Sequence, residues 1–160
     1  MESLLSKLEE MGVDLDVKVD SVHIKGKKEK LKPVDIKTLP YPGFATDIQQ
    51  PLTALLTQAY GQSIVTETIY TERFKHCYEL NKMGANTHVM TPSAMINGPT
   101  PLSGAEVSAT DLRCGACLVI AALIADGVTT IRNIYHIERG YAHIDEKLKA
   151  LGAKMWRETI

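Results

Sequence analysis

Two aspartates stand where a carboxylate could accept a proton from a substrate. Asp47 and Asp111 each follow a threonine, and each Thr-Asp pair precedes a segment with the apolar spacing of a helix. A carboxylate held at a helix start can act as a general base toward a hydroxyl group. The same placement is typical of a helix cap, which binds the first free backbone N–H groups and meets the positive end of the helix dipole. Spacing leaves both interpretations open, and the recurrence of the pair favours the cap.

Three arginines are candidates for binding an anion. Arg73 and Arg139 each follow a glutamate and precede a predicted helix, whereas Arg113 lies two residues after Asp111, in the first turn of its predicted helix. A guanidinium beside free backbone N–H groups can hold a phosphate or a carboxylate. A cation in a first turn opposes the helix dipole, which favours a ligand-facing role for Arg113. Each arginine alone is also compatible with a surface ion pair.

The cysteines and histidines do not indicate a metal or redox site. Cys114 and Cys117 have C-x-x-C spacing, but they share one face of an apolar predicted helix and lack two further ligands at zinc-like spacing. We interpret them, with Cys77, as buried free thiols. The five histidines show no metal-ligand spacing. The sequence therefore predicts neither a metal nor a cofactor.

Composition and charge argue against several classes of function. The 160 residues are 44% hydrophobic and 23% charged, as in an ordinary globular domain, and the formal net charge is −1. No broad positive field is available for nucleic acid or an anionic membrane, and no apolar run reaches the roughly 18 residues of a membrane span. The one basic cluster, Lys25 to Lys32, is typical of an exposed turn. Three cysteines, an odd number, and the lack of a signal peptide after Met1 favour a reducing cytoplasm.

The elements that would position these residues recur along the chain. Three amphipathic helical segments end at a Met-Gly or Leu-Gly pair, and their glycines, Gly12, Gly84 and Gly152, lie 72 and 68 positions apart. Glycine is favoured at a helix C-terminus because it adopts the left-handed conformation without steric cost. Residues 13–19 alternate apolar and polar side chains after the first glycine, which predicts a half-buried strand. Weaker strand patterns follow the other two glycines.

A second pattern recurs between these helices. A helix is predicted from Thr46 to Gly61, and another from Thr110 to Gly127. A β-branched stretch and then a Glu-Arg pair follow each of them. Helices that alternate with strands predict an α/β (α+β) domain. The chain begins inside such a unit, at its second helix, so we expect residues 1–160 to form one partial domain that lacks upstream sequence. The expected units are residues 1–37, which is incomplete, 38–101 and 102–160.

Six blocks of the sequence also form a pattern of fixed order and spacing. They are Tyr41–Gln49, Glu67–Phe74, Met83–Ala85, Leu102–Ala105, Ala109–Arg113 and Ile134–Tyr141. This pattern resembles the bacterial UDP-N-acetylglucosamine enolpyruvyl transferases, and the resemblance extends from about Leu4 to Trp156. The last two blocks distinguish that family from its shikimate-pathway relative.

The resemblance implies a fold and an activity. The fold is the inside-out α/β barrel of the enolpyruvyl transferases, built from repeated units of helices and small mixed sheets, of which this chain would hold the C-terminal part. The activity is transfer of enolpyruvate from phosphoenolpyruvate to the 3′-hydroxyl of UDP-N-acetylglucosamine, the first committed step of peptidoglycan synthesis. The implied partners are these two substrates and the missing N-terminal part of the enzyme, without a cofactor, a metal, nucleic acid or a membrane.

The resemblance also implies roles for individual residues. Asp47 would bind the sugar hydroxyl and act as its base, while Asp111 and Arg113 would support proton transfer and charge at the reacting centre. The other implied substrate ligands are Ile69, which would contact the nucleotide sugar mainly through its backbone, Arg73, and Arg139, which would bind phosphoenolpyruvate.

The family's reactive cysteine has no counterpart in this chain. It lies on a loop in the other half of the enzyme, and none of the three cysteines here matches it. We therefore expect the chain by itself to show no turnover. Two alternatives stay open: a non-catalytic module that binds a nucleotide sugar, and a sister enzyme that acts on a shikimate-type acceptor.

Overall fold

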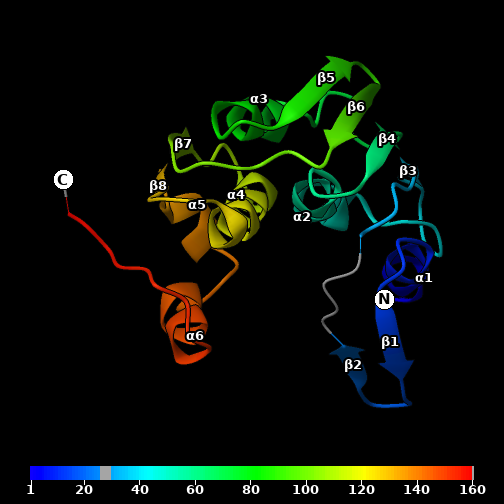
Figure 1. Ribbon diagram of the computed structural model, residues 1–160, viewed down its shortest axis with the longest axis horizontal. Helices are drawn as coiled ribbons and strands as arrows, with labels where there is room; N and C mark the ends of the chain where they lie inside the picture. Colours follow the sequence, from blue (N-terminus) through cyan, green and yellow to red (C-terminus); the bar gives the residue numbers. More distant parts are fainter. Residues whose placement is uncertain (26–29, 160) are drawn as a thin grey trace.

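Short helices alternate with short strands along the chain, as Figure 1 shows. The computed structural model describes residues 1–25 and 30–159. The centre of the predicted basic turn, residues 26–29, lies outside the described residues. In chain order the elements are α1 (Glu2–Glu10), β1 (Asp14–Val17), β2 (Val22–Lys25), β3 (Ile36–Lys37), α2 (Thr46–Leu56), β4 (Gly61–Thr66), α3 (Lys75–Lys82), β5 (Asn86–Met90), β6 (Ser93–Gly98), β7 (Glu106–Ser108), α4 (Leu112–Ile124), β8 (Thr130–Arg132), α5 (Tyr135–Glu138) and α6 (Ile144–Ala150).

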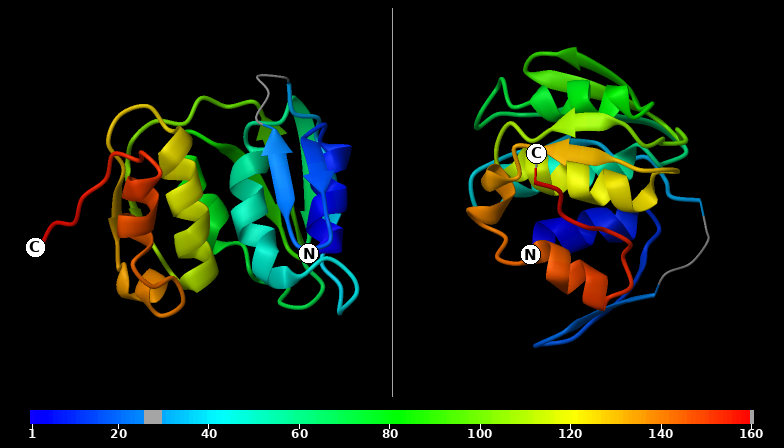
Figure 2. Two further views of the ribbon diagram at one scale, coloured as in Figure 1. Left: turned by 90° about the horizontal axis from the view of Figure 1, so that it is seen from below. Right: turned by 90° about the vertical axis from the view of Figure 1, so that its left-hand side faces the viewer.

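Two parallel strand pairs, each joined by a helix, organise the structure. β3 pairs with β4 across α2, and β7 pairs with β8 across α4. Antiparallel pairing extends the first pair into a four-stranded sheet of order β3-β4-β6-β5. The crossover helices α2 and α4 pack side by side in the middle of the molecule (Figure 2). This arrangement confirms the predicted α/β class.

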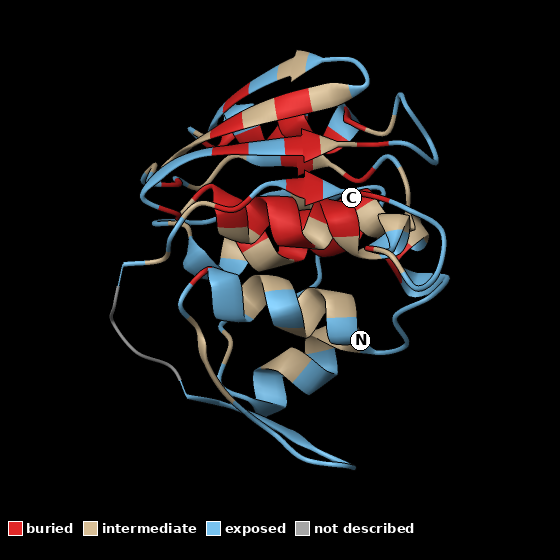
Figure 3. Cartoon of the chain, turned by 90° about the vertical axis from the view of Figure 1, so that its right-hand side faces the viewer, coloured by how far each residue is buried: buried red, intermediate tan, exposed pale blue. Residues whose placement is uncertain are grey.

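The core lies between the central helices and the strands that cover them. Figure 3 shows the buried residues gathered on the strands and on the central helices. α4 is apolar on most sides because it contacts α2, α3 and α5, and Cys114, Cys117 and Leu118 are completely buried. Among the described residues, no helix is long and apolar enough to cross a membrane.

Left-handed glycines follow three helices, as predicted. Gly12, Gly84 and Gly152 follow α1, α3 and α6 with φ angles of 89°, 97° and 100°. The prediction that one helix runs to Gly61 is wrong, because α2 stops at Leu56 and Gly61 opens β4. The residues between them form a turn that carries the chain from the helix into the sheet.

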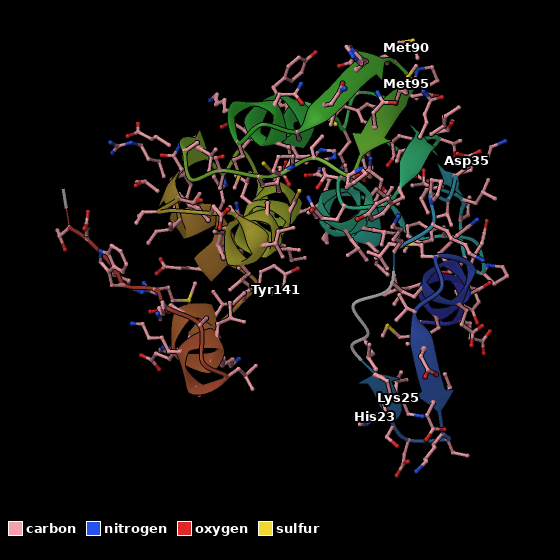
Figure 4. The ribbon with its side chains drawn as sticks, viewed as in Figure 1. His23, Lys25, Asp35, Met90, Met95 and Tyr141 are labelled. Carbon is pink, nitrogen blue, oxygen red and sulfur yellow. The ribbon has the colours of Figure 1, made fainter. Side chains whose placement is uncertain are left out.

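The predicted half-buried strand over residues 13–19 is shorter and more exposed than expected. β1 pairs with β2 in an antiparallel hairpin that projects from the body of the molecule (Figure 1). Figure 4 labels His23 and Lys25 on this hairpin. Val17 is 50% exposed and Val19 is fully exposed. The prediction of burial is wrong for Val17 and Val19, whereas Val13 is partly buried against the core and α1 contacts β1.

The strand predicted after Gly152 is also absent from the described residues. Residues 153–159 run as a tail that pairs with no described strand (Figure 2). Leu151, expected on the buried face of the preceding helix, is 85% exposed. An extended segment is stable as a strand only when a neighbour supplies its hydrogen bonds.

Candidate functional site

The starts of α2 and α4 meet at one end of the helix pair. Each helix follows the first strand of its parallel pair, so the chain enters both crossover helices in the same way. Nε of Arg113, in the first turn of α4, donates a hydrogen bond to Oδ1 of Asp47, in the first turn of α2, at 2.6 Å. Two predicted residues that are 66 positions apart in the sequence are thereby in contact.

Asp47 does not cap its helix. α2 begins one residue earlier, at Thr46, with Ala45 at the N-cap and no side-chain cap hydrogen bond. The Asp47 carboxylate faces two guanidiniums instead, because its Oδ1 also lies 3.6 Å from Nη1 of Arg73. Its side chain is 63% exposed. The capping interpretation is wrong for Asp47, and its carboxylate is accessible to a ligand.

These arginines lower the pKa of Asp47 below its ordinary value. The hydrogen bond from Arg113 has the largest effect, desolvation opposes it, and the charges of Arg113 and Arg73 lower the pKa further. The same contact raises the pKa of Arg113. Asp47 is therefore ionised near neutral pH and can accept a hydrogen bond from a hydroxyl group.

Asp111 is the cap of α4, as the capping interpretation predicted. Its Oδ1 accepts hydrogen bonds from the backbone N–H groups of Arg113, at 2.9 Å, and Cys114, at 3.1 Å. These are two of the N–H groups that have no partner within the helix. The cap also fixes the first turn of α4, from which Arg113 reaches Asp47.

An open pocket of about 570 Å³ lies beside these helix starts. It contains three of the predicted residues, Ile69, Arg73 and Asp111, and Arg73 connects it to Asp47. The pocket is lined by Gln50, Ile69, Tyr70, Thr71, Glu72, Arg73, Lys75, Thr110 and Asp111.

The loop between β4 and α3 forms one wall of this pocket. The guanidinium of Arg73 lies over the ring of Tyr70, 4.0 Å from its centroid. The backbone N–H of Ile69 is already used, because it donates to Oε1 of Glu67 at 3.0 Å. The backbone group that Ile69 can offer to a ligand is therefore its carbonyl oxygen, which accepts hydrogen bonds.

Arg139 lies at the end of α5, apart from the hydrogen bonds and ion pairs described for Asp47. It directly follows the short helix α5, rather than only preceding a helix as predicted. α5 lies close to α4, since a Cβ on Gly115 would clash with Ile137, and Gly140 lies against Leu112. Arg139 thus lies near the start of α4, but no described hydrogen bond or ion pair joins it to Asp47, Arg73 or Arg113.

Sequence reasoning missed Glu67 and Thr46. Glu67 is completely buried, and its carboxylate accepts a hydrogen bond from the Thr46 hydroxyl at 2.9 Å. Thr46 in turn accepts a hydrogen bond from Nη1 of Arg73 at 3.0 Å. The signal in the sequence that could have identified Glu67 is its position as a charged residue within a β-branched stretch that is typical of a buried strand.

The three cysteines are buried free thiols, as predicted. Burial raises the pKa of Cys77 to about 12 and that of Cys117 well above its ordinary value. Burial also lowers the pKa of His76, which is completely enclosed, to about 3, although the charge of Asp111 opposes this effect. None of these four groups lines the pocket.

Comparison with known proteins gives the chain its relatives. Residues 1–148 match the family model of EPSP synthase (3-phosphoshikimate 1-carboxyvinyltransferase). The chain is 58% identical over 160 residues to UDP-N-acetylglucosamine 1-carboxyvinyltransferase 2 of Bacillus subtilis (strain 168). This alignment covers 100% of this chain and 37% of that protein. It is 57% identical to the protein of the same name from Staphylococcus aureus (strain MRSA252), with coverage of 100% and 38%. The chain thus spans little more than a third of the length of these relatives.

Solved structures with this fold are also known. The enolpyruvyl transferase NikO from Streptomyces tendae matches with a TM-score of 0.89 and 35% identity, over 96% of this chain and 35% of that one. EPSP synthase from Acinetobacter baumannii matches with a TM-score of 0.69 and 18% identity, over 98% and 37%, which shows likeness of fold alone. These matches confirm the predicted fold and the resemblance from which it was inferred.

Proposed function

The chain belongs to the EPSP synthase family, and on this basis we propose that the protein containing it transfers enolpyruvate from phosphoenolpyruvate to the 3′-hydroxyl of UDP-N-acetylglucosamine. Phosphate is released, and the product enters peptidoglycan synthesis. The observation that carries the proposal is an exposed carboxylate, Asp47, held between two guanidiniums at paired helix starts beside an open pocket. Because the chain spans 37% of its Bacillus relative, the activity is proposed for the protein that includes it.

Asp47 is the proposed base for the acceptor hydroxyl. Its carboxylate is 63% exposed, so a sugar hydroxyl can reach it. The hydrogen bond from Arg113 keeps its pKa low, which favours the ionised form but weakens the base. We propose that the anionic co-substrate draws the Arg113 guanidinium toward itself, so that the pKa of Asp47 rises when both substrates are bound.

The remaining residues are assigned to binding and to charge. The carbonyl of Ile69, whose N–H is already taken, accepts a hydrogen bond from the sugar. Arg73 and Arg113 offset the phosphate charge as it develops, and Asp111 holds Arg113 in place through the cap of α4. Arg139 is the proposed ligand for phosphoenolpyruvate. The other part of the enzyme supplies the acid that protonates the enol carbon, because the thiols of this chain are buried.

The choice of a nucleotide sugar over a shikimate-type acceptor follows from the relatives. Two full-chain relatives at 57–58% identity are named for UDP-N-acetylglucosamine, whereas the EPSP synthase structure is 18% identical. The family's own description favours the second candidate, transfer to 3-phosphoshikimate. We place the protein in the cytoplasm, which three free cysteines support.

The test is a competition between the two acceptors. The complete protein is incubated with phosphoenolpyruvate and either UDP-N-acetylglucosamine or 3-phosphoshikimate, and the phosphate released is measured. We expect release with the nucleotide sugar alone. Turnover with 3-phosphoshikimate only would refute the assigned acceptor, and a lack of turnover with both would favour a non-catalytic binding module.

A further inference from the structure

We propose that Glu67 is a positioning residue that holds together the two sides of the pocket in which the nucleotide sugar would bind. One side is the loop after β4, which carries Ile69 and Tyr70, and the other is α2, which lines the pocket with Gln50 and carries Asp47 in its first turn. This inference rests on the proposed function, because it assigns Glu67 a role at the same site.

The first arm of Glu67 fixes the loop. Its Oε1 accepts hydrogen bonds from the backbone N–H groups of Ile69, at 3.0 Å, and Tyr70, at 3.1 Å. The hydroxyl of Thr38, after β3, donates to the same oxygen at 2.7 Å. The loop is thus attached to the end of the β3–β4 pair, and the N–H of Ile69 is held by Glu67.

The second arm reaches the start of α2. Oε2 of Glu67 accepts a hydrogen bond from the Thr46 hydroxyl at 2.9 Å, and Thr46 Oγ1 accepts one from Nη1 of Arg73 at 3.0 Å. That same nitrogen lies 3.6 Å from Oδ1 of Asp47. A continuous polar chain therefore links Glu67, through Thr46 and Arg73, to the proposed base.

The arrangement requires a carboxylate of this length. Four donors converge on two oxygens that both act as acceptors, and the side chain is completely buried. A glutamine keeps the length but turns one acceptor into a donor, so its NH₂ group would face Thr46 together with the Arg73 guanidinium. An aspartate is one methylene shorter and cannot span both arms.

Another buried glutamate provides a matched control. Glu79 of α3 is 9% exposed, accepts a hydrogen bond from the backbone N–H of Ser108 at 2.9 Å, and pairs with Lys82. It resembles Glu67 in burial and in accepting a backbone N–H, but its partners Ser108 and Lys82 do not line the pocket. The Glu67 partners Ile69 and Tyr70 do. The variant Glu79→Gln therefore measures how far the loss of a buried carboxylate by itself changes stability and the kinetic constants.

The experiment compares Glu67→Gln and Glu79→Gln in the complete protein. For each variant, kcat, the KM of each substrate and the urea midpoint are measured. We expect Glu67→Gln to raise the KM for UDP-N-acetylglucosamine about tenfold and to lower kcat several-fold, with a smaller change in the KM for phosphoenolpyruvate. We expect Glu79→Gln to leave all three constants within about twofold of the wild type.

Two results would overturn the inference, and a second pair of variants covers a failure to fold. Equal loss of stability in both variants with unchanged kinetic constants would give Glu67 a structural role only. If Glu67→Gln does not fold, Thr46→Val should raise the KM for UDP-N-acetylglucosamine in the same way, and Thr46→Ser should keep the wild-type KM. Equal KM values in Thr46→Val and Thr46→Ser would also refute the inference. A wild-type protein without turnover refutes the proposed function itself, so the two failures are distinguishable.

Discussion

The helix starts of α2 and α4 present the same Thr-Asp pair and use it differently. In α4 the aspartate caps the helix, which begins at the next residue, Leu112. In α2 the helix begins at Thr46, so Asp47 lies inside the first turn with its carboxylate directed to guanidiniums. One Thr-Asp pair therefore stabilises a helix, while the other leaves a charged group available for chemistry.

The two units also differ at the residue that follows the strand after each helix. The N–H of Thr38 donates to the carbonyl of Thr66, and in the other unit the N–H of Ala109 donates to the carbonyl of Arg132. The next residue is Glu67 in the first unit and is Asn133 in the second.

These two residues bind different partners. Glu67 captures the Thr46 hydroxyl, whereas Asn133 donates to the hydroxyl of Ser108 at 2.7 Å. The buried glutamate thus binds the helix start that carries the proposed base, whereas Asn133 binds the strand that precedes the capped helix.

The largest expected effect in this comparison is the loss of turnover when Asp47 is replaced. We expect Asp47→Ala to lower kcat of the complete protein by about 10³-fold, because the proposed general base is lost. Its unfolding free energy should change by less than about 1 kcal/mol, since exposed ion pairs contribute little. Steady-state kinetics and urea unfolding measure the two quantities. Near-normal turnover would leave Asp47 with an ion-pairing role only.

The buried histidine behind the α4 start should make stability depend on pH. His76 has a pKa of about 3 in the folded protein against 6.5 when unfolded, so the unfolded state binds more protons between these values. Stability from this group is then complete above pH 6.5 and is lost as the pH falls toward 3. We expect a loss of about 2 kcal/mol from pH 7 to pH 5.

The control for this prediction is His76→Gln, which cannot titrate. Urea unfolding of both proteins at pH 7 and pH 5 separates the histidine from other groups, since only the difference between their pH dependences counts. Identical dependences would show that His76 takes up its proton without unfolding.

Removal of the α4 cap should have a smaller effect on stability. We expect Asp111→Ala to lower the unfolding free energy by about 1 kcal/mol, because two backbone N–H groups lose their acceptor. Asp111→Asn should recover most of this loss, since asparagine is also a good cap. If Asp111→Ala and Asp47→Ala cost the same stability, the contrast between the two helix starts would disappear.

The sequence predicted the elements better than their surroundings. Periodicity located the helices and the terminal glycines because these depend on neighbours within a few residues. The predicted burial was wrong for Val17, Val19 and Leu151, because burial depends on what covers an element. The division into three units and the role of Arg139 stay predictions.

The site was predicted in part for the same reason. Asp47, Arg73 and Arg113 were identified, and the structure brings them together. Which aspartate caps its helix could not be predicted, because both follow a threonine and the Thr46 hydroxyl binds Glu67, 20 positions farther along the chain than Asp47. Local pattern does not report a hydrogen bond of that range.

The smallest expected effect concerns the pKa of Asp47 itself. Arg113 lowers it through a direct hydrogen bond, whereas Arg73 acts only through its charge and has the least influence. We expect the pKa of Asp47 to rise in Arg113→Ala and to rise less in Arg73→Ala. Titration of the Asp47 carboxyl carbon by NMR measures each shift, with Asp145, which pairs with Arg157 far along the chain, as an internal reference. A larger rise in Arg73→Ala would mean that the loop between β4 and α3, and not α4, has the larger effect on the pKa of Asp47.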